Sequence, residues 1–297
     1  MALFSPVERL LAMRYMRARR AEGFISVIAW FSLAGITLGV ATLIIVMSVM
    51  NGFRAELVGR ILGLNGHVGV YAAGGQGIAD FDPLSVSLAE IPGVIAVTPQ
   101  VEGQVMATRG TVNLGAVVRG VRWSDLAARR PLWEALNEQA IAGFRDEGGL
   151  LIGKTMAFKM GVVVGDTITL TSARGEATAF GTLPSRRTYR IAGVFDVGMH
   201  EYDSSFIFMP LAVAGKLFGM KDRASGLEIY TADPQNIATI RVLVADRIGD
   251  SLRAFDWLQR NRTFINALRV ERNVMFLILT LIILVAAFNI ISSMIML

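Results

Sequence analysis

A long run without any charged residue, Gly23 to Phe53, constrains this chain more than any other feature. Its central part, Phe24 to Met50, would reach roughly 40 Å as an α-helix at about 1.5 Å per residue, which is enough to cross a bilayer with some tilt. A buried helix of a soluble protein is usually polar on one face, whereas this segment is apolar all round. We therefore predict a transmembrane helix over residues 23–50.

A second uncharged run, Asn273 to Leu297, closes the chain. We predict a second transmembrane helix over residues 273–297, and we expect the natural protein to continue because the chain is still apolar at Leu297. The composition agrees, since 53% of the residues are hydrophobic and only 18% are charged, unlike an average soluble protein. Residues 51–272, between the two runs, are numerous enough to bury a core of their own.

The basic residues indicate which side of the membrane each part occupies. Residues 1–22 are predicted to form an interfacial helix, and under the positive-inside rule their arginines place the N-terminus in the cytoplasm and the main domain in the periplasm. A cleaved signal peptide is excluded because the apolar run is far too long. Four arginines just before the second span, on the predicted periplasmic side, conflict with this orientation. These four are Arg260, Arg262, Arg269 and Arg272. We assign the orientation from the N-terminal arginines.

The region between the apolar runs has the pattern of an α+β domain. An alternating pattern on either side of Arg109-Gly110 predicts a β-hairpin. The predicted strands are 67–72, 94–98, 101–108, 111–118, 150–153, 166–172, 188–195, 205–209 and 226–230, and the predicted helices are 84–90, 124–137 with a break at Pro131, and 234–248. The predicted fold class is a membrane protein with α-helical spans and a large α+β periplasmic domain. That domain would comprise one discontinuous subdomain, 51–120 plus 226–272, and one inserted β-rich subdomain, 121–225.

Small and polar residues inside the predicted spans suggest where helices pack. Gly35 and Gly39 form a G-x-x-x-G pair, which lets another helix approach closely, and Asn289 would prefer a neighbouring helix to lipid. Met47, Val49 and Met50 lie at the outer end of the first span. Flexible methionines there could line an adaptable apolar surface, and ordinary lipid-facing residues are the alternative.

Other motifs suggest chemistry but lack the context that it needs. Gly148 to Thr155 matches the phosphate-loop pattern, but the apolar residues inside the motif are predicted to form a strand instead of a loop. We therefore do not predict ATP binding. His200 to Asp203 gathers metal-ligand types, but we predict a solvated turn. The chain has no cysteine and no G-x-S-x-G motif, and its arginines form no basic stripe with interleaved aromatics. We therefore predict neither an enzyme nor a cofactor, metal site or nucleic-acid partner.

The segment Ser172 to Arg187 is longer than a hairpin needs and combines Phe180 with paired arginines. An apolar side chain beside fixed charges is typical of a partner-binding loop tip. A tolerated loop insertion is the alternative reading.

Taken together, several segments resemble the LolC/LolE family of lipoprotein-releasing ABC-transporter permeases over essentially the whole chain. They are the basic lead-in, Gly35 to Val40, Met47 to Phe53 followed by Glu56-Leu57, Ile152 to Lys154 followed by Gly165-Asp166, and Asn261 to Met294 with its core Leu284 to Ile290. The chain departs from the family at Asn65-Gly66-His67, where a proline often precedes the histidine, and in the residues at the tip of the 172–187 segment.

The resemblance implies a multi-pass protein of the bacterial inner membrane with four spans. It also implies these partners: a cytoplasmic ABC ATPase, a second permease subunit, a periplasmic lipoprotein chaperone, lipoprotein substrates and membrane lipid. Residues 172–187 are similar to the chaperone-binding hook of the LolC branch, with Phe180, Gly181, Pro184, Arg186 and Arg187 in that role. The residues expected near acyl chains are Val46, Met47, Val49 and Met50.

The function expected from the resemblance is ATP-driven extraction of lipoproteins from the inner membrane and delivery to the chaperone. Hydrolysis of ATP would belong to the partner subunit. Two alternatives stay open: a related permease acting in mechanotransduction or efflux, and a two-span periplasmic sensor.

Overall fold

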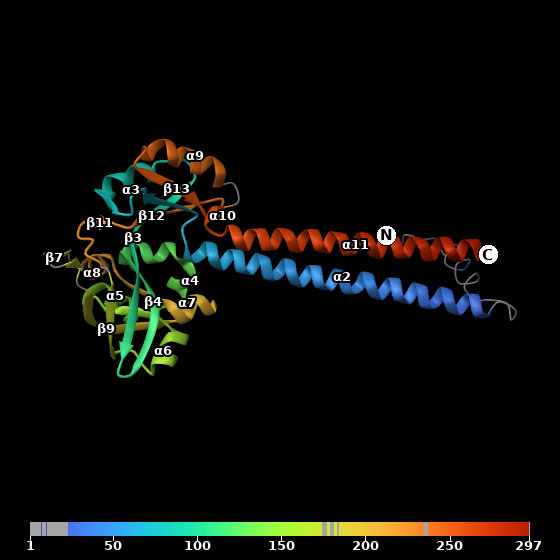
Figure 1. Ribbon diagram of the computed structural model, residues 1–297, viewed down its shortest axis with the longest axis horizontal. Coiled ribbons are helices and arrows are strands. Elements are labelled where there is room, and N and C mark those ends of the chain that lie inside the picture. The colour runs from blue at the N-terminus through green and yellow to red at the C-terminus, as the bar shows by residue number, and fades with distance from the viewer. Residues whose placement is uncertain are drawn as a thin grey trace. The chain divides into compact units, whose positions relative to one another are not determined.

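The computed structural model describes Val7, Leu10 and residues 23–173, 177–178, 181–182, 184–234 and 237–296 (Figure 1). It divides the chain into two compact units. The first comprises Met1–Glu56 with Arg262–Leu297, and the second comprises Leu57–Asn261. Apart from Val7 and Leu10, the predicted interfacial helix lies outside the described residues.

Two long helices, α2 (Gly23–Leu64) and α11 (Arg262–Met296), dominate the first unit and run alongside each other (Figure 1). By length and composition, Leu33–Leu64 and Ile265–Phe288 could each cross a membrane. Both helices are longer than the predicted spans. Helix α2 does not end at Met50, and α11 begins eleven residues before the predicted start at 273, because the lack of charge marks the part of a helix that suits the bilayer and not the residues at which the helix begins and ends.

The second unit is built on a nine-stranded sheet in the order β13-β1-β12-β3-β4-β10-β5-β9-β6. The strands are β1 (Val68–Ala72), β3 (Val94–Arg109), β4 (Val112–Val121), β5 (Leu150–Gly153), β6 (Thr167–Ser172), β9 (Ser185–Phe195), β10 (Phe206–Pro210), β12 (Gly226–Thr231) and β13 (Leu252–Asp256). Strand β3 also pairs with β6. This extra pairing closes β3, β4, β10, β5, β9 and β6 into a barrel, and β12, β1 and β13 extend from it.

Two hydrophobic clusters lie on opposite sides of the barrel wall. Ile152 and Ile168 point into the barrel with Met156 and Met160 of α6 (Lys154–Met160). Leu151, one residue from Ile152, belongs instead to the outer cluster, because successive side chains of a strand point to opposite faces. The outer cluster also contains residues of α5 (Glu138–Glu147) and α7 (His200–Ser205). Each fully buried apolar side chain contributes roughly 1.5–3 kcal/mol, so the second unit has a substantial core of its own.

Strand β3 connects the barrel to the rest of the sheet. Its first half, from Val94 to Gln100, pairs with β12, and its second half pairs with β4 and with β6. The sequence predicted two strands here, 94–98 and 101–108, whereas the structure has one continuous strand. Strands β3 and β4 both lie in the barrel, so the sheet runs without interruption past residue 120. The division into 51–120 plus 226–272 and 121–225 stays a prediction.

The remaining elements comprise six helices and two small two-stranded sheets, β11-β2 and β7-β8, among the described residues. They are β2 (Ile78–Ala79), α3 (Phe81–Ala89), the 3-10 helix η1 (Trp123–Ala128), α4 (Arg130–Glu134), β7 (Ala177–Thr178), β8 (Gly181–Thr182), α8 (Leu211–Leu217), β11 (Arg223–Ala224), α9 (Ile237–Ile248) and α10 (Trp257–Arg260). The predicted break at Pro131 is wrong: the interruption falls at Arg129, and Pro131 occupies the first turn of α4. Proline suits that place because its missing N–H would have no partner there.

Candidate functional site

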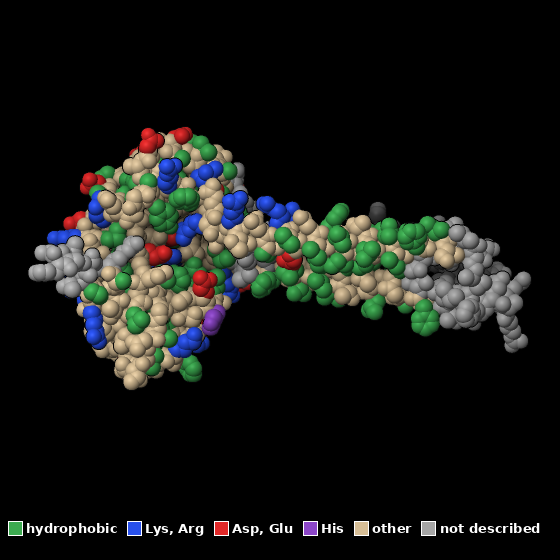
Figure 2. All heavy atoms as spheres, in the orientation of Figure 1, with side chains coloured by type: hydrophobic (Ala, Val, Ile, Leu, Met, Phe, Trp, Pro, Cys, Tyr) green, Lys and Arg blue, Asp and Glu red, His purple; other side chains and the backbone are tan. Residues whose placement is uncertain are grey.

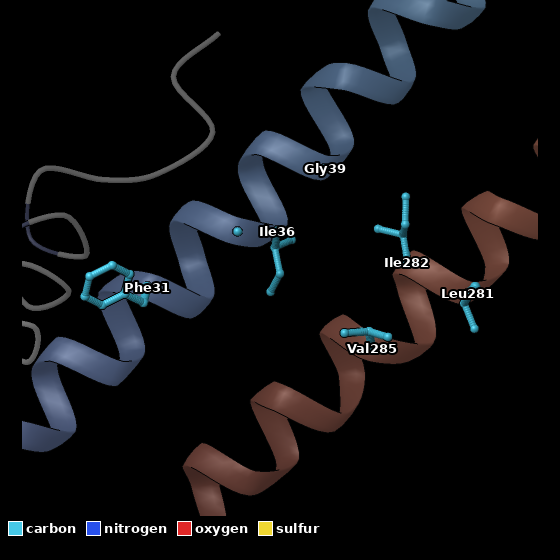
Figure 3. A pocket seen from close by; sticks show the side chains of 7 residues that line it. Phe31, Ile36, Gly39, Leu281, Ile282 and Val285 are labelled. Atoms are coloured by element: carbon cyan, nitrogen blue, oxygen red, sulfur yellow. The ribbon is translucent and has the colours of Figure 1, made fainter.

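An apolar groove lies between the two long helices of the first unit (Figure 3). Gly39 lies opposite Ile282, and a Cβ added to it would be 4.0 Å from the Ile282 Cγ2 atom; a Cβ at Gly35 would meet nothing within 4 Å. Ile36 of α2 and Val285 of α11 point into the space between the helices (Figure 3). The groove has a volume of about 480 Å³ and is lined by Phe31, Gly35, Ile36, Gly39, Leu281, Ile282 and Val285.

The chemistry of this groove is entirely that of hydrocarbon. None of its seven lining side chains carries a polar atom, so it suits an apolar chain rather than a polar ligand. The two glycines supply the room, since neither has a side chain to fill it. The predicted helix-packing residues Gly35 and Gly39 therefore line a groove, and the side chain of Asn289 lies outside the described residues.

The four residues expected near acyl chains are further along α2. Val46, Met47 and Val49 are exposed by 42%, 39% and 68%, and Met50 is half-buried. None of the four lines the groove. Their exposure leaves them available to lipid or to another helix, and their role stays a prediction.

The predicted chaperone-binding segment is described only in part. Phe180 lies outside the described residues. Gly181 belongs to β8, which pairs with β7, and Pro184 is exposed. Arg186 and Arg187 are exposed on β9, where they pair with Thr171 and Leu170 of β6. Strand pairing fixes the backbone of both arginines while leaving their guanidinium groups in solvent.

The phosphate-loop match has the wrong architecture for nucleotide binding. Helix α5 ends at Glu147, directly before Gly148, where a phosphate loop would need a preceding strand. Strand β5 occupies the interior of the motif and pairs with β9 and β10, so its backbone N–H groups are engaged in the sheet. Lys154 is bound to Asp196 at 2.9 Å. This confirms the reading of Leu150 to Ile152 as strand.

The segment from His200 to Asp203 is not a solvated turn as predicted. It forms helix α7, in which Tyr202 and Asp203 are buried. The Asp203 side chain accepts a hydrogen bond from the Val197 backbone N–H at 3.0 Å, and Tyr202 stacks on Phe206. Two of the four residues therefore hold the helix against the sheet. Among the described residues, no group of three or more His, Cys, Asp or Glu side chains is placed to hold a metal ion.

The structure reveals a buried charged cluster that the sequence did not predict. Arg129 donates to Glu228 at 2.8 Å, and both side chains are completely buried. Tyr230 also donates to Glu228, at 3.3 Å, and an Arg260 nitrogen lies 3.8 Å from the other Glu228 carboxylate oxygen. One carboxylate thus binds side chains from the η1–α4 junction, from β12 and from α10.

A second buried arginine extends the cluster to the end of α2. Arg119 on β4 donates twice to Glu102, at 2.9 and 2.7 Å, and once to Asn65 at 3.0 Å. Asn65, directly after α2, donates to the Tyr202 hydroxyl at 2.6 Å. Burial raises the pKa of Glu228, but Arg119, Arg129 and Arg260 outweigh it, so the net pKa lies below its ordinary value. The carboxylate is therefore charged at neutral pH.

Similar proteins were found across the whole chain. Residues 29–246 match the sequence pattern of the MacB-like periplasmic core domain family. The lipoprotein-releasing system transmembrane protein LolC of Neisseria meningitidis serogroup B is 32% identical, in an alignment that covers 98% of this chain and 70% of that protein. The corresponding LolE of Haemophilus influenzae is 28% identical over 96% of this chain and 70% of its own length. Among solved structures, the extracellular domain of the noncanonic ABC-type transporter YknZ from Gram-positive bacteria covers 64% of this chain and 99% of its own, with 14% identity and a TM-score of 0.41.

Proposed function

The chain belongs to the LolC/LolE family of lipoprotein-releasing transmembrane proteins, and from this premise we propose that it is a permease subunit that extracts lipoproteins from the bacterial inner membrane. The observation that carries the proposal is the 32% identity to a LolC protein over 98% of the chain. The two long apolar helices and the hydrocarbon-lined groove between them support it.

Physical chemistry indicates which partners such a subunit needs. Each CH₂ group of an acyl chain that leaves the bilayer costs roughly 0.8 kcal/mol. Extraction therefore requires an energy source, which we assign to a cytoplasmic ABC ATPase, and an apolar receiver, which we assign to a periplasmic chaperone. The permease itself is non-catalytic and works with a second permease subunit. Its N-terminus lies in the cytoplasm and its second unit in the periplasm.

We assign acyl-chain contact to the face of α2 that carries Val46, Met47, Val49 and Met50, and chaperone contact to the segment 172–187. Support for the second assignment is the exposure of Arg186 and Arg187 on a strand whose backbone is fixed by pairing. Rigid display of cations close to the exposed Pro184 suits an acidic or apolar partner surface.

The test is chaperone-dependent release. The protein, its ATPase and its partner permease are reconstituted in liposomes that carry a lipoprotein, and ATP-dependent transfer to soluble chaperone is measured. Arg187→Glu should weaken chaperone binding by roughly 2 kcal/mol or more, about thirtyfold. Arg253→Glu, a charge reversal at an exposed position on β13, should leave binding unchanged.

Two other results would redirect the assignment. Release that proceeds normally with Arg187→Glu would contradict the role of the segment but not the permease function. Failure of the wild-type complex to release any lipoprotein would refute the proposed function, and would favour a related permease in mechanotransduction or efflux, which the match to a MacB-like domain also fits. No observation here favours the two-span sensor.

A further inference from the structure

The first three turns of α11 carry three exposed arginines, Arg262, Arg269 and Arg272. No hydrogen bond or ion pair joins any of them to another residue that the structure describes. In this they differ from the neighbouring Arg260, which faces Glu228 in the second unit. Unpaired cations at this place need an explanation, because the positive-inside rule disfavours arginines on the side of the membrane that carries the main domain.

The three arginines lie on one side of the helix. At about 100° per residue, Arg262 and Arg269 point in nearly the same direction, and Arg272 lies about 60° from Arg269. The helix has one acidic residue, Glu271, which lies about 180° from Arg262 and is half-buried. The arginine face is thus not neutralised by a carboxylate of its own helix.

The same face changes character abruptly at Asn273. Further along it come Phe276, exposed by 71%, and Ile283, exposed by 59%. In Figure 2, Lys and Arg atoms on the first turns give way to hydrophobic atoms along the rest of the helix. Such a change from cations to exposed hydrocarbon is expected where a helix enters the bilayer core.

Helix geometry separates the arginines by depth. If the hydrocarbon begins at Asn273, Arg272 lies at its edge, Arg269 about 6 Å above Asn273 and Arg262 about 16.5 Å above it. The headgroup layer is roughly 5–7 Å thick on each side of the bilayer. Arg269 and Arg272 therefore lie within the layer of lipid phosphates, and Arg262 lies beyond it.

We propose that Arg269 and Arg272 bind the phosphate of an anionic phospholipid at the membrane surface where α11 enters. Guanidinium groups suit this ligand because their planar N–H donors match phosphate oxygens. The proposal rests on the membrane insertion of α11 that is part of the proposed function.

The experiment uses the whole chain, purified in an uncharged detergent and titrated with phosphatidylglycerol or phosphatidylcholine, with bound lipids counted by native mass spectrometry. Phosphatidylglycerol should bind more tightly. Arg269→Gln and Arg272→Gln should each weaken its binding about fivefold, the factor expected for one arginine at a charged membrane surface. Arg262→Gln is the matched control, on the same face but beyond the headgroups, and should change binding less than about twofold.

Every other result counts against the proposal in an identifiable way. Equal binding of phosphatidylglycerol and phosphatidylcholine would refute the site and would favour binding of an acidic protein by the arginines. A loss of phosphatidylglycerol binding in Arg262→Gln as large as that in Arg269→Gln would also refute the site. Displacement of the lipid by inorganic phosphate at the same concentration would overturn the lipid assignment and show a simple phosphate site. Flotation of the wild-type chain with neutral liposomes tests the premise separately: a chain that does not float would refute membrane insertion itself.

Discussion

Replacing Glu228 by glutamine should destabilise the second unit more than almost any other change of a single charge. The substituted amide would retain the shape of the side chain and one acceptor oxygen. It would leave Arg129, completely buried, without a carboxylate. Arginine cannot lose its proton in a protein, so the charge would remain in the interior.

The expected loss in the free energy of unfolding is about 3–5 kcal/mol, the range measured when one partner of a buried ion pair is removed. Glu147→Gln is the matched control, because Glu147 pairs with Arg190 in solvent, with both side chains about 60% exposed. That exposed pair should contribute roughly 0.2–1 kcal/mol. The two variants make the same chemical change and differ only in burial.

Urea unfolding of the whole chain in detergent at pH 7, followed by tryptophan fluorescence, would measure both effects, since Trp123, Trp133 and Trp257 lie in the second unit. Replacing both partners, Glu228→Leu with Arg129→Met, should cost less than the sum of the two single changes, because neither member of the completely buried pair is then left without the other. If Glu228→Gln came within about 0.5 kcal/mol of Glu147→Gln, the reasoning from burial would be wrong.

The same comparison has a defined pH dependence. The three arginines hold the pKa of Glu228 below its ordinary value of 4.5, despite its burial. A carboxyl whose pKa is lower in the folded state contributes stability above the unfolded pKa and loses it as the pH falls through the folded pKa. The advantage of the wild type over Glu228→Gln should therefore be complete at pH 7 and shrink as the pH falls below 4.5. An advantage that grew on acidification would have the opposite sign and would refute the assignment.

Two glycine substitutions test the packing of each unit. Gly153→Ala places a Cβ too close to the backbone of Asp203 to fit without a backbone shift, and should lower the free energy of unfolding in urea by about 1–3 kcal/mol. In the control Gly115→Ala, the added Cβ meets nothing within 4 Å, so this change should not destabilise the second unit. Equal losses in the two variants would refute the close approach of Gly153 and Asp203. Gly39→Leu fills the groove between α2 and α11 and should weaken binding of an acyl chain by about 1–3 kcal/mol, roughly 5- to 150-fold, measured as slower lipoprotein release. Gly52→Leu, on the same helix outside the groove, should release normally. Release unaffected by Gly39→Leu would exclude the groove from the acyl path.

Local features of this chain were predictable from sequence. The hairpin on either side of Arg109-Gly110 is confirmed, and Gly110 has the positive φ of 56° that the tight turn needs. The two uncharged runs were predicted as helices from their length and lack of charge, and residues 23–53 lie within α2 and residues 273–296 within α11. The barrel was not predictable, because β3 meets β6 and β6 meets β9 through pairings distant in sequence. Alternation of side chains fixes which face is buried but not which strand lies alongside.

The buried charged cluster could not be predicted from the sequence for a different reason. Glu228 lies in a strand whose six residues are all buried. From sequence alone, an acidic residue in such a strand is predicted to be exposed, because its charged partners are not known. Those partners, Arg129 and Arg260, are separated from it by 99 and 32 positions. An isolated charge inside an otherwise apolar strand was the available signal, and it indicates a paired ion without identifying the pair.

The cluster also explains how the second unit holds its two connections to the long helices. Asn65 follows α2 directly and is bound by Arg119, whereas Arg260 precedes α11 by two residues and lies against Glu228. Opening either connection would break a polar contact to an almost fully buried charge, Arg119 or Glu228, whereas fraying a solvated helix end costs little. We therefore expect the segments at Asn65 and Arg260 to resist local opening within the second unit.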